Sequence, residues 1–491
     1  MSGSTSTPPA RPAAGSEPRP LAERLSSLRQ LTDSGGPVPP ELLLAGLSDP
    51  APSMRQASAW AIGKLHEARG RIGLEAALED PEPAVRSSSA EALGVLSSLE
   101  SRTPLEHALA DPVARVRTQA AWALWSIASP LSAPALLARL TDEDDEVRWS
   151  AVVALGRMPG ASTSGPVRAM LRDPSDRVRR ESIHALARQG SPETVEWIRP
   201  LLADPSEKVR IAAAVVLGSC SDRTALPQLL EELARAGTWG KPALLVALGK
   251  IGDPRAGPAI RAALADRASW TRVCAARSLA QLGWEGAPEA LRASLADPSW
   301  AVRGAAAESL GRVGAPTDLT RLLELLEDPH PWPRRGALYA LGRLRLVESA
   351  PRVREELYNG SSEVRLAAVW TLGRLGDDGA REQLATLLGQ STPARGEAST
   401  VAEGDGAVKL LSDANSRLFD TIIQALGRLR PGDPDPFTAH TILEARARVG
   451  ENEWERPARL PAPESEAGGA SPTLRELFET ALPLSAEETD G

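Results

Sequence analysis

Short runs of apolar residues at helical spacing follow one another along the chain, and their arrangement returns every 31 residues. In one run Val85, Ser89, Ala92, Leu93 and Leu96 recur at helical spacing, which places them on one face of a helix. A second amphipathic run, for example 319–326, precedes each polar break. We call the predicted helix before the break helix A and the one after it helix B. Each interval therefore predicts a helical hairpin.

The polar break is an Asp that is usually followed by Pro. Because Pro cannot continue a helix and Asp can accept hydrogen bonds from backbone N–H groups, this pair indicates where helix A ends and helix B starts. A basic residue follows six positions after the Asp, and Gly or another small residue follows eight positions later. The Asp and Arg pairs in this register are Asp49 and Arg55, Asp80 and Arg86, Asp111 and Arg117, Asp142 and Arg148, Asp173 and Arg179, Asp204 and Arg210, Asp266 and Arg272, Asp297 and Arg303, and Asp328 and Arg334, while Arg235 and Asn359 replace the Asp ahead of Lys241 and Arg365.

A repeat of this length cannot bury its apolar face alone, so it has to stack on its neighbours. The period therefore predicts an all-α protein, a right-handed α-solenoid of about twelve 31-residue helical hairpins. We expect no strand between residues 40 and 430.

Two segments carry a resemblance to a known family, "DPEPAVRSSSAEALGVL" at 80–96 and "DPSWAVRGAAAESLGRV" at 297–313. They resemble HEAT repeats, specifically the short bacterial type related to phycobilisome-lyase HEAT-like repeats, and the resemblance covers about 40–430. It implies an armadillo-like α-α superhelix, in which an Asp and an Arg six residues apart commonly belong to a hydrogen-bonded ladder. We therefore interpret the Asp and Arg register as structural, and expect Arg303 to bond to an Asp such as Asp297 or Asp266.

The domain boundaries follow from where this register begins, breaks and ends. The predicted parts are a disordered tail over 1–19, a capping helix and linker over 20–39, the repeat array over 40–430 with an insertion at 390–412, a candidate closing helix over 431–450, and an acidic Pro-rich tail over 451–491 whose amphipathic patch at 473–484 either docks in cis or binds a partner.

Charge and composition narrow the classes of partner. The tail 451–491 holds ten acidic and three basic residues, a net charge of −7 out of −8 overall, so the rest of the chain is close to neutral. This balance disfavours nucleic acid, because a protein that follows a phosphate backbone shows a basic excess. The sequence has no run of 18 apolar residues and no secretory signal, which predicts a cytoplasmic protein without a membrane span.

Some side chains on helix B are not required by the repeat. The position eleven residues after the Asp lies on a stripe that is predicted to face the inner, concave wall of the solenoid. Trp and Arg are enriched at interface hot spots, although Trp can also fill gaps between helices. The candidate partner-binding residues on or near this wall are Trp60, Trp122, Trp149, His184, Trp239, Trp270, Arg277, Trp300, Trp332, Tyr339 and Trp370. A row of cations four positions further on, which includes Arg312, Arg343 and Arg374, either caps helix C-termini or receives an acidic peptide.

Catalytic patterns are weak in this sequence. The five His are scattered, the two Cys lack metal-ligand spacing, and no Gly-rich phosphate loop is present. We therefore expect no catalytic residue, no metal and no cofactor. The sequence favours a non-catalytic scaffold or adaptor that binds other proteins or peptide segments. The alternatives are a regulatory or catalytic subunit of a lyase-like modifying enzyme, and a nucleic-acid-binding protein.

Overall fold

A computed structural model describes residues 20–33, 38–158, 163–359 and 361–390 of the chain. These residues form helices and turns and contain no strand. None of the helices in these ranges is both long and apolar enough to cross a membrane. The described residues divide into two compact units, one ending at Ile198 and one starting at Arg199.

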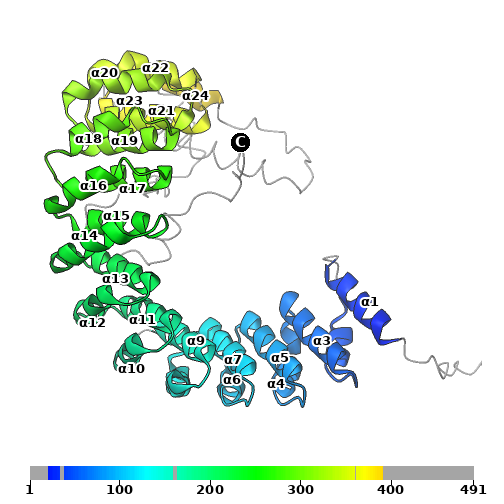
Figure 1. The fold of residues 1–491 in the computed structure, drawn as a ribbon. Coiled ribbons are helices and arrows are strands. Elements are labelled where there is room, and N and C mark those ends of the chain that lie inside the picture. Colours follow the sequence, from blue (N-terminus) through cyan, green and yellow to red (C-terminus); the bar gives the residue numbers. More distant parts are fainter. Residues whose placement is uncertain (1–19, 34–37, 159–162, 360, 391–491) are drawn as a thin grey trace, which may run out of the picture. The chain divides into compact units, whose positions relative to one another are not determined.

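The first unit stacks five helical hairpins behind one leading helix. Figure 1 shows its A helices, such as α4 and α6, in one layer and its B helices, such as α5 and α7, in the other. The leading helix is α1 (Leu21–Asp33), the A helices are α2 (Pro40–Gly46), α4 (Arg71–Ala77), α6 (Arg102–Ala108), α8 (Ala133–Leu137) and α10 (Ser164–Ala169), the B helices are α3 (Pro52–Lys64), α5 (Pro83–Leu96), α7 (Ala114–Ile127), α9 (Asp145–Gly156) and α11 (Asp176–Gln189), and α12 (Thr194–Ile198) ends the unit.

The second unit repeats the arrangement. It begins with the 3-10 helix η6 (Arg199–Ala203), which packs on the B helix α13, and ends with α24. Its A helices are α14 (Leu226–Arg235), α16 (Gly257–Ala263), α18 (Ala287–Ser294), α20 (Leu319–Glu324), α22 (Ala350–Asn359) and α24 (Arg381–Gln390), and its B helices are α13 (Glu207–Ser219), α15 (Gly240–Ile251), α17 (Ser269–Leu279), α19 (Trp300–Val313), α21 (Pro331–Arg343) and α23 (Ser362–Leu375).

The buried face of helix B is the one that the apolar pattern predicts. In α5 the side chains of Val85, Ser89, Ala92 and Leu93 are all buried, and Leu96 at the end of the helix is half-buried. Consecutive B helices pack directly on each other, as α5 does on α3 and on α7. The prediction of an all-α solenoid built from helical hairpins is confirmed.

A close approach between B helices explains the recurrent Gly. A Cβ atom added to Gly94 would lie 2.9 Å from the Cα of Ala123 on the next B helix. At Gly218 the corresponding distance to the Cα of Ala247 is 2.7 Å. A larger residue at either position would push two repeats apart, which makes this Gly a packing residue.

The Asp of each break forms its hydrogen bond within the turn between helix A and helix B, and not with the first turn of helix B. Its carboxylate accepts a hydrogen bond from the residue two positions later, as in the 2.9 Å bond from the Glu82 N–H to Asp80. Helix B then begins at Pro83, so Asp80 stabilises the turn ahead of the helix instead of its first turn. The predicted insertion at 390–412, except for Gln390, lies outside the described residues, as do helix B of the twelfth repeat, the closing helix and both predicted tails.

Candidate functional site

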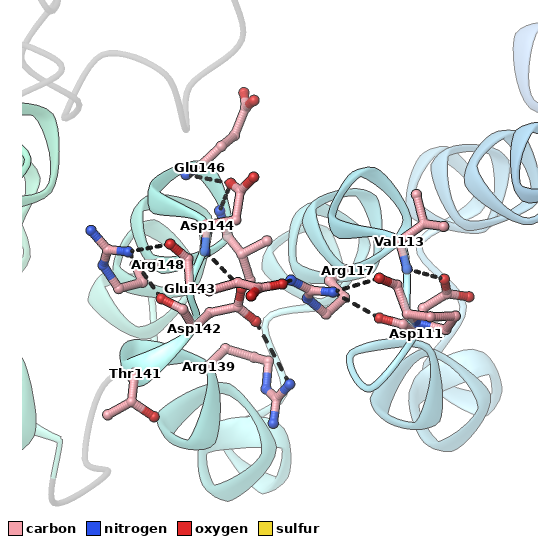
Figure 2. Close-up of polar contacts among 12 residues, drawn as sticks. Asp111, Val113, Arg117, Arg139, Thr141, Asp142, Glu143, Asp144, Glu146 and Arg148 are labelled. Carbon is pink, nitrogen blue, oxygen red and sulfur yellow. Dashed lines mark hydrogen bonds and ion pairs between the residues drawn. The ribbon is translucent and has the colours of Figure 1, made fainter.

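The Arg of helix B connects two repeats through one side chain. In Figure 2, Arg117 lies between Asp111 of its own repeat and Asp142 of the next. Its Nη1 donates to the backbone oxygen of Asp111 at 2.9 Å, and its Nη2 donates to the Asp142 carboxylate at 2.7 Å. The carboxylate partner of Arg117 is thus the Asp 25 residues later, whereas the Asp six residues earlier supplies its carbonyl.

The same contact recurs along both units. Arg303 follows this rule, because its carboxylate partner is Asp328 at 2.6 Å and Asp297 contributes only its carbonyl at 2.9 Å. Asp266, the other predicted partner of Arg303, pairs with Lys241 instead. The other carboxylate contacts join Arg55 to Asp80, Arg86 to Asp111, Arg148 to Asp173 and Arg272 to Asp297, at 2.6 to 2.8 Å, while Arg179 and Arg210 donate to the carbonyls of Asp173 and Asp204.

Where the sequence lacks the Asp, a Glu three positions earlier takes its place. Arg210 has Arg235 at its 25-residue position and instead forms an ion pair with Glu232 at 2.9 Å. Arg334 has Asn359 there and lies 3.9 Å from Glu356. Both Glu side chains are buried. Sequence reasoning missed these two residues, although the shared three-residue offset was available as a signal.

The leading helix joins the same ladder. Arg24 on α1 donates to Asp49, the first Asp of the register, and the two positions are 25 residues apart. Helix α1 packs against α3 as one B helix packs against the next. The first helix therefore packs on the stack in the way a B helix does. The 25-residue spacing of Arg24 and Asp49 could have indicated this from the sequence.

Hydrogen bonding sets the ionisation of these carboxylates. Hydrogen bonds from the Arg55 guanidinium lower the pKa of Asp80, and the Glu82 N–H adds to this effect. For Asp297, burial raises the pKa, but hydrogen bonds from Arg272 and from the Ser299 N–H outweigh it, so that its pKa is also lowered. The ladder thus favours the ionised form of its acids.

The candidate aromatic residues of the first unit lie on the B helices. Trp122 makes edge contacts with Trp125 at 5.8 Å and with Trp149 at 5.2 Å between ring centroids. Arg177 lies over the Trp149 ring at 3.4 Å. Trp60 stands apart, with 41% of its surface exposed and Lys64 over its ring.

His184 lies on α11 in the same unit and is half-buried. Burial lowers the pKa of its imidazole, which keeps the ring neutral at neutral pH.

The second unit carries aromatic residues both at the start of helix B and further along it. At the helix starts, Trp300 stacks on His330 at 4.0 Å and contacts Trp332 at 5.3 Å between ring centroids. Further along the helices, Tyr339 meets the edge of Trp370 at 5.3 Å. These rings are half-buried.

Glycines make room for two of these rings. A Cβ atom on Gly304 would lie 2.4 Å from the Trp332 ring, and one on Gly342 would lie 2.7 Å from the Trp370 ring. Trp332 and Trp370 therefore pack against the preceding repeat while part of each ring remains at the surface. These contacts are compatible both with a packing role and with a binding role for Trp332 and Trp370.

Trp239 and Trp270 differ from the other candidates because they are open to solvent. Trp239, just before α15, is 95% exposed, and Trp270 at the start of α17 is 39% exposed. Trp239 lies in a repeat whose Asp-Pro break is replaced by the sequence from Arg235 to Gly240. The exposed Trp239 therefore lies where the sequence departs from the repeat pattern.

A polar cavity lies between α17 and α19 in the second unit. Its volume is 210 Å³, and it is lined by Arg277, Ala280, Gln281, Glu308, Ser309 and Arg312. Arg277, the one cation among the predicted wall residues, is half-buried here. The sequence placed Arg277 and Arg312 in separate rows, and the structure brings them to the same cavity.

The described parts of the chain offer little for catalysis or metal binding. Within these ranges no group of three or more His, Cys, Asp or Glu could hold a metal ion. Cys274 is buried, and burial raises the pKa of its thiol to about 11, which leaves it protonated.

Comparisons with known proteins agree with the geometry. The HEAT repeats family matches seven overlapping segments that together span residues 40–402, more than half of the 491 residues. No curated protein matches the sequence.

Solved structures show similar folds. Yeast importin-β is 13% identical with a TM-score of 0.55 over 88% of this chain and 68% of its own, and a second importin-β structure is 14% identical with a TM-score of 0.54 over 86% and 70%. The complex of CpcE and CpcF of phycocyanin lyase from Nostoc sp. PCC7120 is 23% identical with a TM-score of 0.31 over 49% of this chain and 92% of its own. At these identities the likeness concerns the fold alone. With its repeating hairpins and this family match, the chain belongs to the HEAT repeat family.

Proposed function

We propose that this protein is a non-catalytic scaffold or adaptor of the cytoplasm that binds partner proteins along its helix-B layers. The observation that carries the proposal is Trp239, an indole that is 95% exposed at the start of a B helix. Trp is among the residues most enriched at binding hot spots, and this indole leaves its large apolar surface in contact with water.

The neighbouring repeats extend this surface. Trp270 is the second residue of the next B helix, Trp300 is the first residue of the one after it, and Trp332 is the second residue of the one that follows. Further along the B helices, Tyr339 and Trp370 add partly exposed rings. A segment crossing successive repeats would therefore meet one aromatic residue per repeat, which suits recognition of an extended partner at several sites.

Substitution at two Trp residues tests the proposal. The partner is first purified from the native host with the full chain and then titrated against variants. Trp239→Ala should weaken binding by about 2 kcal/mol or more and leave the free energy of unfolding within about 0.5 kcal/mol. Trp370→Ala should weaken binding similarly and also cost stability, because its ring packs on Gly342.

The matched control is Val347→Ala, which removes an apolar side chain of the same unit that is 55% exposed but lies outside the B helices. It should change neither binding nor stability. Full retention of the partner by Trp239→Ala together with a core-type loss of about 3 to 5 kcal/mol in Trp370→Ala would contradict binding at Trp239 and make Trp370 a packing residue.

A further inference from the structure

Four consecutive B helices of the second unit present a row of arginines. Arg277 on α17 and Arg312 on α19 line the same 210 Å³ cavity, together with Glu308. Arg343 on α21 and Arg374 on α23 continue the row at the position of Arg312 in the two following repeats. Each repeat thus adds one guanidinium.

Arg343 sits next to this cavity. Its Cδ would lie 3.4 Å from a Cβ atom on Gly311, so the side chain crosses the preceding B helix close to Arg312. Its Nη1 is buried, and no group among the described residues accepts a hydrogen bond from it. Burial lowers the pKa of Arg343, the nearby Arg312 and Arg374 lower it further, and Glu308 opposes them. This guanidinium is short of an anionic partner.

We propose that this row, with the cavity at its start, binds an acidic, extended segment of a partner protein. Carboxylates of the segment would pair with Arg277, Arg312 and Arg343, since guanidinium and carboxylate form paired hydrogen bonds. The inference rests on the proposed function and specifies the chemistry of the partner.

The repeat sets the spacing that such a segment needs. Packed helices lie about 8–10 Å apart, and an extended chain rises about 3.3 Å per residue. An acidic residue at about every third position would therefore meet one Arg on each B helix. Tyr339 and Trp370, at the surface of the same helices, can contact the intervening side chains.

Glu308 favours an acidic peptide over a nucleic acid as the ligand of this row. Glu308 lines the cavity together with Arg277 and Arg312, and its carboxylate would repel a phosphate but can accept a hydrogen bond from a backbone N–H of a peptide. A peptide backbone offers such donors at each residue other than Pro, whereas a phosphodiester backbone offers none.

Titration of the full chain with a fluorescent peptide of five Glu-Gly-Ser units tests the inference. We expect binding that weakens with added salt and that is about tenfold tighter than for a peptide of the same composition with its five Glu in succession. Arg343→Gln and Arg312→Gln should each weaken it about tenfold or more. Arg261→Gln, an exposed cation on α16, is the matched control and should change it less than about twofold.

Melting temperatures of the variants show whether each one is folded. Because Arg312 is exposed, we expect Arg312→Gln to fold, so it tests the inference even if Arg343→Gln is unstable. Equal affinity for both peptides, or no effect of either variant, overturns the inference. So does tighter Arg-dependent binding of a fifteen-residue oligothymidylate, which would assign the row to nucleic acid. Binding that appears only after the acidic residues of 451–491 are changed to amides would assign it to the chain's own tail. If the peptide fails while Trp239→Ala still loses the natural partner, the proposed function stands and this inference alone is wrong.

Discussion

At the scale of single residues, Arg303 shows how one side chain holds two repeats. It donates to the Asp328 carboxylate of the next repeat and to the carbonyls of Asp297 and Pro298 in its own. The Asp328 carboxylate in turn accepts from the His330 N–H at 2.9 Å. Arg303 and Asp328 therefore connect the turns before two successive B helices through one network of hydrogen bonds.

Arg303→Ala should lower the free energy of unfolding by about 1 to 3 kcal/mol, because it leaves Asp328 and a carbonyl without their charged donor. Thermal or chemical denaturation measures the loss. Arg267→Ala, in an exposed part of the same kind of turn, should stay within about 0.5 kcal/mol. An unchanged melting temperature accompanied by loss of the partner would make the ladder a binding site instead.

Acid should weaken the ladder in a defined range of pH. The pKa of Asp80 is lowered in the folded protein, so its pairing stabilises the fold above the unfolded pKa of about 4 and is lost as pH falls through the lower folded pKa. Stability measured from pH 6 down to pH 2 should therefore fall below about pH 4. In Asp80→Asn this fall should be smaller, and an identical pH profile would show that Asp80 does not contribute.

At the scale of helices, α14 replaces a missing contact. It ends at Arg235, where the register would have an Asp, and Glu232 within the helix turns to Arg210. Glu232 also pairs with Arg235 at 3.0 Å. A buried carboxylate between two guanidiniums keeps the stack in register where the Asp is absent.

Glu232→Ala should cost about 3 to 5 kcal/mol, because it leaves Arg210 without its acid in a largely buried site. Glu231→Ala is the control, since Glu231 is the adjacent residue and is 67% exposed. Denaturant unfolding of both variants measures the difference. Equal stability of the two would mean that Arg210 is satisfied by the carbonyls of Asp204 and Pro205 alone.

The 31-residue period predicts the positions of the helices well, but it predicts the hydrogen-bond partners of their side chains only in part. The position of α5 and its buried residues follow from apolar spacing and from Pro, because both act locally. The partner of Arg303 depends on the offset between stacked repeats, which no local pattern contains. The exposure of Trp239 against the half-burial of Trp332 depends on the neighbouring residues, such as Gly304, that each ring meets after stacking.

At the scale of the whole molecule, both units expose apolar side chains on their B helices. Val95 on α5 is 43% exposed, and Val246 on α15 is 38% exposed. We propose that a partner protein covers these layers in each unit. The A side of each unit offers matched positions for comparison, Ile72 on α4 and Val347 in the 3-10 helix η11 (Val347–Ser349), which are 69% and 55% exposed.

Site-specific photo-cross-linking in the native host tests this claim most directly. A benzophenone amino acid replaces one of the four residues Val95, Val246, Ile72 or Val347 at a time in the full chain, and adducts are identified by mass spectrometry. We expect adducts with the same partner protein from Val95 and Val246 and none from Ile72 and Val347. Adducts only from Ile72 and Val347, or equally from all four positions, would contradict it.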